Sequence, residues 1–504
     1  MTQKTNLIFS LSLALLGSLT FADEVASTEK ITPIKSAVKT NGTIVHNRAQ
    51  KSIESFSEMF QEGEFYGRLR NNNFYFTYEH DDSGHETQLV GAIGASFVFD
   101  SASYNGFDFT VGLYGSQSFF DENDLDSVSH LKPAKDTLSR YKYATTGSQS
   151  LFAFAQANIN YKYSKTNFTL GRQLVETFYT KSNDTKMIPN SFDGLVVSSR
   201  DIAASKVTLA YLAKQKLRDH EDAHAVLMYD DSDTTNFSTW TGNDDSAMHK
   251  GLSYTNLKAA GKATDAPLIV LDATNRSLKN LTINFSSYLV PELLSQVMGE
   301  VNYKIAFDGF SITPAVRYIQ QFDNGAGAVA GASLRGNATL LDPNGYDNPN
   351  SLDAKMIAAK VVTKFSDYRL NLAYTHILDE ADLVTPWRGF PTAGYTRSMG
   401  IYNWRANTKS YRLELVKGAN KTGIYTKPFI QASVLYVDSD EEKAIFEDSM
   451  YYYVGLVQNI PSYKNLQYRV RLGYRDFIGD DTAYTSYLNV SNYLDSRLEF
   501  NYLF

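Results

Sequence analysis

Basic side chains are interleaved with tyrosine, leucine and phenylalanine in several stretches of the chain. Guanidinium groups bind carboxylates and phosphates through charge-assisted, often paired hydrogen bonds. A row of such groups along a water-filled passage would offer weak, exchangeable sites for anions. The residues expected to form this basic ladder are Lys304, Arg317, Arg369, Arg412, Arg469, Arg471 and Arg475. The alternative is that they form ion pairs with acids of the same face, such as Glu414 and Glu499.

Acidic residues crowd one long segment, residues 219–245. They are Asp219, Glu221, Asp222, Asp230, Asp231, Asp233, Asp244 and Asp245. If this loop folded into the passage, it would form an acidic constriction opposite the basic ladder, and the resulting field would orient zwitterions such as amino acids. The alternative is a solvated external loop, or one bridged by divalent cations beside lipopolysaccharide.

Three features of the sequence bear on whether the protein is an enzyme, and none of them supports a catalytic site. Residues 220–224 read H-E-D-A-H and match H-E-x-x-H literally, but the surrounding loop lacks the helix that would place both imidazoles on one metal. Gly325, Gly327 and Ala330 fit a loose dinucleotide-binding pattern without a strand–helix–strand unit. The chain has no cysteine, which excludes thiolate metal sites and a cysteine nucleophile. The sequence therefore predicts no enzyme, no resident metal and no cofactor.

The elements that carry the basic residues have a period of two, the pattern of strands with one apolar and one polar face. In residues 465–475, one set consists of Leu466, Tyr468, Val470, Leu472 and Tyr474. The set between them consists of Gln467, Arg469, Arg471, Gly473 and Arg475. A charge facing lipid near the bilayer midplane costs about 2–4 kcal/mol, so the aromatic set is expected to face lipid and the arginines water.

This alternation continues from residue 64 to residue 504 without a linker that would divide domains. With about 25 residues for each strand and connector, the stretch predicts roughly 16–18 strands. The predicted fold is all-β, a transmembrane antiparallel β-barrel with short periplasmic turns and long external loops. At this size the interior is wide enough for an aqueous channel.

The N-terminus has the pattern of an export signal. An apolar run from Leu7 to Leu19 follows Lys4, and Thr20-Phe21-Ala22 provides a cleavage site, which predicts a signal peptide over residues 1–22. Residues 23–63 are expected to form a polar periplasmic arm, with a short helix over residues 52–60. The acidic balance, a formal charge of −7, argues against nucleic acid as a partner.

The last residues, LEFNYLF, place aromatic side chains at alternate positions, Phe500, Tyr502 and Phe504. This ending resembles the terminal strand signal that the barrel assembly machinery recognises in outer-membrane proteins. Together with the export signal, it predicts a location in a bacterial outer membrane, in contact with lipid and lipopolysaccharide.

Three phrases resemble the OprD-type porins, including the OprD-like porins of ε-proteobacteria. They are EFYGRLR at residues 64–70, FTLGRQ at 168–173 and KMIPNSFDG at 186–194. The resemblance is specific at the last two and loose in the long loops. It implies eighteen strands and passive, partly selective diffusion of small hydrophilic solutes such as amino acids, small peptides or carboxylates. It also implies a monomer or a homotrimer.

Two other functions fit an outer-membrane barrel. A barrel enzyme, such as a lipase or protease, would need a nucleophile paired with histidine, and none of the eight histidines lies near a G-x-S-x-G sequence. A surface adhesin or structural barrel would use the long loops and could have a plugged lumen. The leading expectation is a diffusion porin.

Overall fold

The computed structural model describes residues 36–47, 53–80, 84–120, 125–227, 249–336, 345–418, 424–425, 427–443, 448–478 and 491–504. The expected signal peptide, residues 1–22, lies outside the described residues. The same holds for five acids of the expected constriction loop, Asp230, Asp231, Asp233, Asp244 and Asp245.

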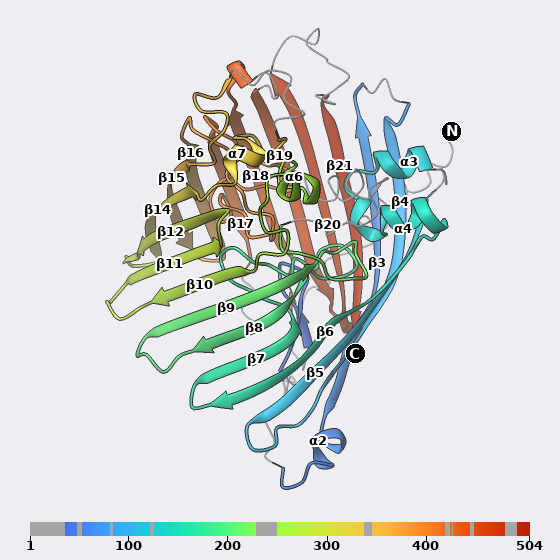
Figure 1. The fold of residues 1–504 in the computed structure, drawn as a ribbon. Helices are drawn as coiled ribbons and strands as arrows, with labels where there is room; N and C mark the ends of the chain where they lie inside the picture. Colours follow the sequence, from blue (N-terminus) through green and yellow to red (C-terminus); the bar gives the residue numbers. More distant parts are fainter. Residues whose placement is uncertain are drawn as a thin grey trace. The chain divides into compact units, whose positions relative to one another are not determined.

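The strands form one closed antiparallel barrel in which each pairs with its neighbours in sequence, and the last strand pairs with the first (Figure 1). Its first elements are β3 (Glu64–Tyr78), β4 (Thr87–Asp100), β5 (Phe107–Phe120), β6 (Ser150–Tyr163), β7 (Thr166–Gln173), β8 (Ser191–Ser199), β9 (Ser205–Lys216), β10 (Leu268–Asn275), β11 (Leu281–Val290) and β12 (Leu294–Tyr303). The others are β13 (Ile305–Ala306), β14 (Phe310–Asp323), β15 (Ala354–Phe365), β16 (Tyr368–Ile377), β17 (Lys409–Lys417), β18 (Phe429–Asp438), β19 (Asp448–Ile460), β20 (Tyr463–Ile478) and β21 (Tyr493–Leu503). Because β12 and β13 both pair with β14 as one interrupted strand, the barrel has eighteen strands, which confirms the predicted fold class.

The alternation in the sequence sets the two faces of the wall. Along β17, Tyr411 and Leu413 are exposed on the outside, whereas Arg412 and Glu414 are buried in the lumen. Successive side chains of a strand point to opposite faces, so one apolar and one polar series is enough to orient the whole strand. The outer face carries aromatic and aliphatic side chains around the barrel, as a lipid-facing surface requires.

The connections differ at the two ends of the barrel. One end has tight turns, such as those between β6 and β7 and between β15 and β16, where Ser164 and Ser366 adopt positive φ values of 54° and 48°. The other end has long loops that carry α3 (Leu125–His130), η1 (Lys135–Thr137), α4 (Arg140–Thr146), α6 (Tyr254–Ala259), α7 (Gly327–Ala330) and η4 (Glu441–Lys443). Figure 1 shows α3, α4, α6 and α7 at the end opposite to α2 (Glu58–Gln61). Among the described residues, no helix is long and apolar enough to cross a membrane.

Two long loops fold into the barrel and form much of its apolar core. The indole nitrogen of Trp387 donates to the carbonyl oxygen of Val226 at 2.7 Å, which joins residues 378–408 to residues 217–227. Tyr288, on the inner face of β11, donates to the carbonyl oxygen of Val384 at 2.7 Å. Trp387, Trp404 and Tyr288 are all almost fully buried. The lumen is therefore narrowed by packed loops rather than open along its full width.

The described part of the N-terminal arm has more structure than the sequence predicts. Residues 36–46 form a hairpin, with β1 (Ser36–Val38) paired to β2 (Ile44–His46), where no regular structure was expected. The strands of this short hairpin are mostly apolar, and Ala37 and Val38 are buried, so its partners in the barrel stabilise it. The expected helix over residues 52–60 is shorter and later: α2 is one turn, and Phe56 and Phe60 are exposed.

Candidate functional site: a basic cavity in the lumen

A cavity of about 1140 Å³ lies inside the barrel, between the wall formed by β20 and β21 and the loops that fold inward. Among the described residues, its lining contains thirteen basic side chains: Lys132, Lys135, Arg140, Lys186, Arg218, Lys250, Arg335, Arg388, Arg397, Arg405, Arg412, Arg471 and Arg497. Of the carboxylates that the structure describes, Asp136 and Asp495 share this lining. Clefts lined by one sign of charge raise the local concentration of ions of the opposite sign. The described part of the lining is therefore predominantly basic.

Both carboxylates of the lining are already paired. Asp136 accepts a hydrogen bond from Arg218, and Asp495 binds Arg497 in a two-pronged contact of 2.8 and 2.5 Å. Burial opposes ionisation of Asp136, but Arg218, Arg388 and Lys135 together lower its pKa. Each of these two acids thus pairs with one arginine of the lining, while Arg405, Arg412 and Arg471 pair with Asp382, Glu414 and Glu499 outside it.

The guanidinium groups carry most of that charge. Burial, with Arg497 nearby, holds the pKa of the Lys186 ammonium well below its usual range, and its Nζ lies 4.6 Å from the centroid of the Phe74 ring. Arginine keeps its proton in such surroundings because its pKa in water is above 12. Arginine is therefore the residue that can keep a buried lumen wall positive.

The direction of some of these arginine side chains follows from their position in a strand. The direction of the others follows from how the loops pack. Arg412, Arg471 and Arg497 point inward because they occupy the polar series of β17, β20 and β21. Arg140 begins α4, whose N-terminus is capped by Ser139, which accepts a hydrogen bond from the Lys142 backbone at 3.2 Å.

The structure separates the seven residues of the expected ladder. Arg412 and Arg471 line the cavity, and Arg317, Arg369, Arg469 and Arg475 belong to the inward series of their strands. Lys304 keeps the parity of the inward residues Glu300 and Asn302, but it lies exposed at the break between β12 and β13, near the short-turn end and outside the cavity.

Four of the ladder arginines pair with acids of the lumen. The closest nitrogen–oxygen distances are 2.6 Å for Arg317–Glu300, 2.5 Å for Arg412–Glu414, 3.4 Å for Arg369–Glu414 and 3.5 Å for Arg471–Glu499. The ion-paired alternative therefore describes these four. Arg469 instead donates to the carbonyl oxygen of Thr40 at 3.3 Å, and Arg475 donates to the Ser449 hydroxyl at 3.1 Å.

The sequence does not predict the loop arginines that complete the lining of the cavity. Arg388, Arg397 and Arg405 lie in residues 378–408, which have no periodic pattern. Arg397 lies over three aromatic rings, with its guanidinium carbon 4.6 Å from Phe390, 5.2 Å from Tyr402 and 5.7 Å from Trp404. Such stacking positions a guanidinium group without neutralising it. Arginine among aromatic residues was the only signal available in this segment.

The hairpin of residues 36–46 lies against a second basic cluster on the inner wall. Arg68 donates to the carbonyl oxygen of Gly42 at 2.7 Å and to the Asp184 carboxylate at 2.5 Å, and Arg70 contacts the same carboxylate at 2.6 Å. His46 lies 2.6 Å from Glu64, and its ring stacks on Tyr66 at 4.3 Å. The hairpin thus occupies part of the lumen beside β3.

The described part of the expected acidic loop does not form an acidic wall. Asp219 is buried, Glu221 pairs with Lys142 at 2.8 Å, and Asp222 is exposed. None of these three lines the basic cavity. His220 and His224 have their ring centroids 5.0 Å apart in a segment without a helix, so the arrangement of H-E-x-x-H on one helix face is not formed.

Comparison with known proteins places this architecture in a family. The family model described as outer membrane porin, OprD family, matches residues 60–383, which is more than half of the chain. The chain belongs to the OprD family. It is therefore an outer-membrane porin, a barrel for the passive diffusion of small solutes, and the family predicted from its motifs is confirmed.

Solved structures agree in fold. OccAB3 of Acinetobacter baumannii is 14% identical, with a TM-score of 0.62 over 88% of this chain and 99% of that chain. OccK9 (OpdG) of Pseudomonas aeruginosa is 15% identical, with a TM-score of 0.59 over 88% and 99%. OccAB1 of Acinetobacter baumannii is 15% identical, with a TM-score of 0.62 over 90% and 99%. No curated protein matches the sequence.

The two most specific OprD phrases are neighbours in space. In LGRQ, Arg172 binds Asp193 of NSFDG through two contacts of 2.6 and 2.8 Å, across the pair β7–β8. Gly171 has a φ of 114°, and a Cβ there would lie 2.5 Å from the carbonyl oxygen of Ala157. The two phrases thus meet on adjacent paired strands of the wall, and the ion pair joins them.

Proposed function

We propose that this porin is selective for anions and that its preferred solutes are small carboxylates. The observation that carries this proposal is the ratio of thirteen basic to two acidic side chains among the described residues that line the lumen cavity. Carboxylates match the geometry of guanidinium groups, and several alternative partners at similar positions allow a solute to exchange between them. Zwitterions would need an acidic surface opposite, which the described lining does not provide.

Reversal potentials in planar bilayers test the selectivity. Under a potassium chloride gradient, the native channel should favour chloride, and small dicarboxylates such as succinate should reduce the chloride current more than glycine or lysine does. Arg471→Gln should reduce the preference for anions, because Arg471 lines the cavity and its partner Glu499 keeps a contact of 2.9 Å with Arg70.

Lys304→Gln is the matched control, since it removes the same charge from a position outside the cavity. It should leave the reversal potential unchanged. A native channel that prefers cations, or an equal shift in both variants, would contradict the proposal.

The route to the membrane completes the proposed function. Residues 1–22 would direct export and be removed after Ala22, and the aromatic ending at Phe500, Tyr502 and Phe504 would be bound by the barrel assembly machinery. The N-terminal sequence of the protein purified from outer membranes tests the cleavage site.

A further inference from the structure

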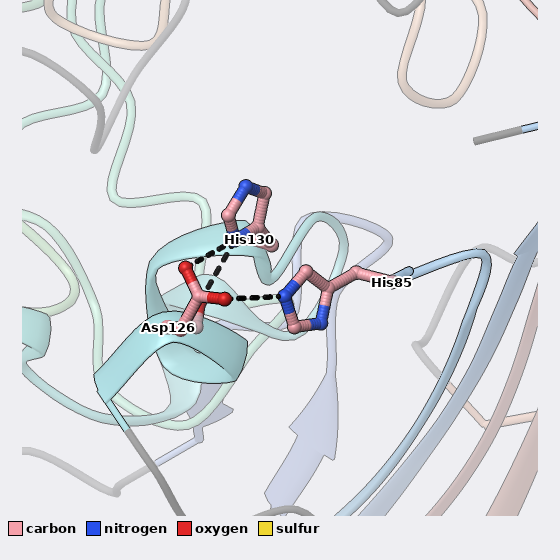
Figure 2. A group of neighbouring side chains, drawn as sticks. All are labelled: His85, Asp126 and His130. Atoms are coloured by element: carbon pink, nitrogen blue, oxygen red, sulfur yellow. Dashed lines mark hydrogen bonds and ion pairs between the residues drawn. The ribbon is translucent and has the colours of Figure 1, made fainter. Parts of the chain in front are cut away.

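Three potential metal ligands meet at the long-loop end of the barrel. His85 lies between β3 and β4, and Asp126 and His130 lie one turn apart on α3, in the loop between β5 and β6 (Figure 2). Oδ2 of Asp126 is 3.0 Å from Nε2 of His85, and Oδ1 is 3.5 Å from Nδ1 of His130. One ligand atom from each residue lies within 4.8 Å of the other two.

These separations suit the donors of one metal ion. Ligand atoms bonded to zinc at about 2.1 Å, at tetrahedral angles, lie about 3.4 Å apart. The distances from the two carboxylate oxygens of Asp126 to the histidine nitrogens, 3.0 and 3.5 Å, lie on either side of that value. Nδ1 of His130 also lies 2.8 Å from the carbonyl oxygen of Asp126 and 3.1 Å from the Ser129 hydroxyl, which are its hydrogen-bond partners when no metal is bound.

The chemistry of the donor set narrows the class of ion. Imidazole nitrogens suit zinc, copper, iron and nickel, whereas calcium and magnesium are bound by oxygen ligands alone. Two imidazoles and one carboxylate are a common zinc set, and three protein ligands leave a fourth position for water. The Asp126 side chain is 74% exposed, so water and metal can reach the site, while His85 at 12% and His130 at 32% are held against the protein.

We propose that His85, Asp126 and His130 bind one divalent transition-metal ion, with zinc the best match, and that this ion links the β3–β4 and β5–β6 loops. The site adjoins the lumen, because His130 and the residues after it, Leu131 and Lys132, line the basic cavity. A bound ion would fix α3 at the rim of the cavity. The proposal is independent of the selectivity of the pore.

Protons can occupy the same positions, with each histidine donating a hydrogen bond to Asp126, so the test must separate metal binding from hydrogen bonding. The untagged protein, folded in detergent micelles and stripped with a chelator, is titrated with zinc chloride in a calorimeter. The native protein should bind about one equivalent, and the zinc should remain after gel filtration.

The variants identify the ligands. His85→Ala, His130→Ala and Asp126→Asn should each weaken zinc binding by more than about tenfold, since even the loss of an outer-sphere partner costs that much. His80→Ala is the matched control, an exposed histidine before the same loop, and should bind as the native protein does. Heat-modifiable mobility on gels verifies that each variant is folded.

Two results would overturn the proposal. The first is a native protein that binds no zinc, which leaves hydrogen bonds as the only role of the cluster. The second is zinc binding that survives in the His85→Ala/His130→Ala double variant. Loss of that binding in His220→Ala would assign it to the His220–His224 pair instead.

Discussion

At the scale of single residues, the lumen wall is organised by carboxylates that each serve several arginines. Glu499 on β21 lies 2.9 Å from Arg70 and 3.5 Å from Arg471, and it also interacts electrostatically with Arg469 and Arg68. A buried acid that is removed from such a group leaves uncompensated charges, which costs about 3–5 kcal/mol. The acids thus allow several arginines to lie close together in the wall.

His249 is a buried residue of the long-loop end that makes this region sensitive to acid. Its Nε2 donates to the carbonyl oxygen of Gly331 at 2.9 Å, and Nδ1 accepts from the backbone of Gly251 at 3.0 Å. A neutral ring satisfies both contacts and a charged ring does not. Burial accordingly lowers the pKa of His249 to about 4.

We expect the packing of residues 249–251 against residues 330–336 to weaken on acidification. The unfolded segment takes up a proton near pH 6.5 and the folded segment only near pH 4, so stability falls as pH falls through this window. At pH 5 the loss is about 2 kcal/mol relative to pH 7. Amide hydrogen exchange, corrected for intrinsic rates, should show faster opening at pH 5. His249→Gln should remove the pH dependence, and a native protein whose exchange in this segment is the same at both pH values would contradict the prediction.

At the scale of elements, the hairpin of residues 36–46 is seated by contacts rather than by its own strand pairing. One pair of three-residue strands is too short to be stable alone in water. Besides Arg68, the hairpin turn meets Asn41–Glu176 contacts of 3.2 Å and the Arg469–Thr40 contact of 3.3 Å. These partners come from β3, β20 and the loop after β7, so the element depends on the closed barrel around it.

A substitution at Gly42 tests whether these contacts hold the hairpin in the lumen. Its φ is 83°, and a Cβ would lie 1.7 Å from the carbonyl oxygen of Asp184. Gly42→Ala should therefore displace the hairpin and raise the single-channel conductance, because the turn occupies part of the lumen. The left-handed conformation alone costs a non-glycine residue about 1–2 kcal/mol, and the steric overlap adds to it.

Gly84→Ala is the control that separates the cost of the left-handed backbone from the effect of the steric overlap. Gly84 has a similar φ of 78°, but nothing lies within 4 Å of a Cβ built there. Its conductance should match that of the native channel. If both variants conduct alike, the hairpin does not restrict the lumen.

At the scale of the whole molecule, closure of the barrel depends on the contact between its first and last strands. Phe504 exchanges backbone hydrogen bonds of 3.1 and 3.2 Å with Gly67 on β3, and its ring lies 5.6 Å from that of Phe97. A Cβ on Gly67 would come within 2.6 Å of the Phe504 ring. The terminal aromatic residue thus covers a glycine at the seam, the junction where β21 pairs with β3 and closes the barrel.

We expect Phe504→Ala to reduce the yield of folded barrel in outer membranes several-fold, since it weakens the seam and the proposed assembly signal together. The folded fraction is measured by heat-modifiable gel mobility. Phe307→Ala is the control: Phe307 is also an exposed aromatic residue, and it stacks on Phe310 at a turn away from the seam. An equal loss in both variants would show that outer-surface aromatics act generally and that Phe504 has no special role.

The sequence by itself determined the wall of this protein. Side-chain direction in a strand is a local property with a period of two, so Arg412 between Tyr411 and Leu413 already points inward before any strand is paired. The alternation of tight turns and long loops follows from the same pattern. The phrases LGRQ and NSFDG, joined by Arg172 and Asp193, are the sequence features that indicate the family.

Only the tertiary structure decided what those side chains meet. Arg70 and Glu499 are 429 residues apart and become neighbours when the barrel closes. Residues 378–408 and the hairpin of residues 36–46 have no periodic pattern, and their positions follow from packing inside the barrel. The cavity and the His85–Asp126–His130 cluster combine residues from separate connections, so no spacing along the chain could predict them.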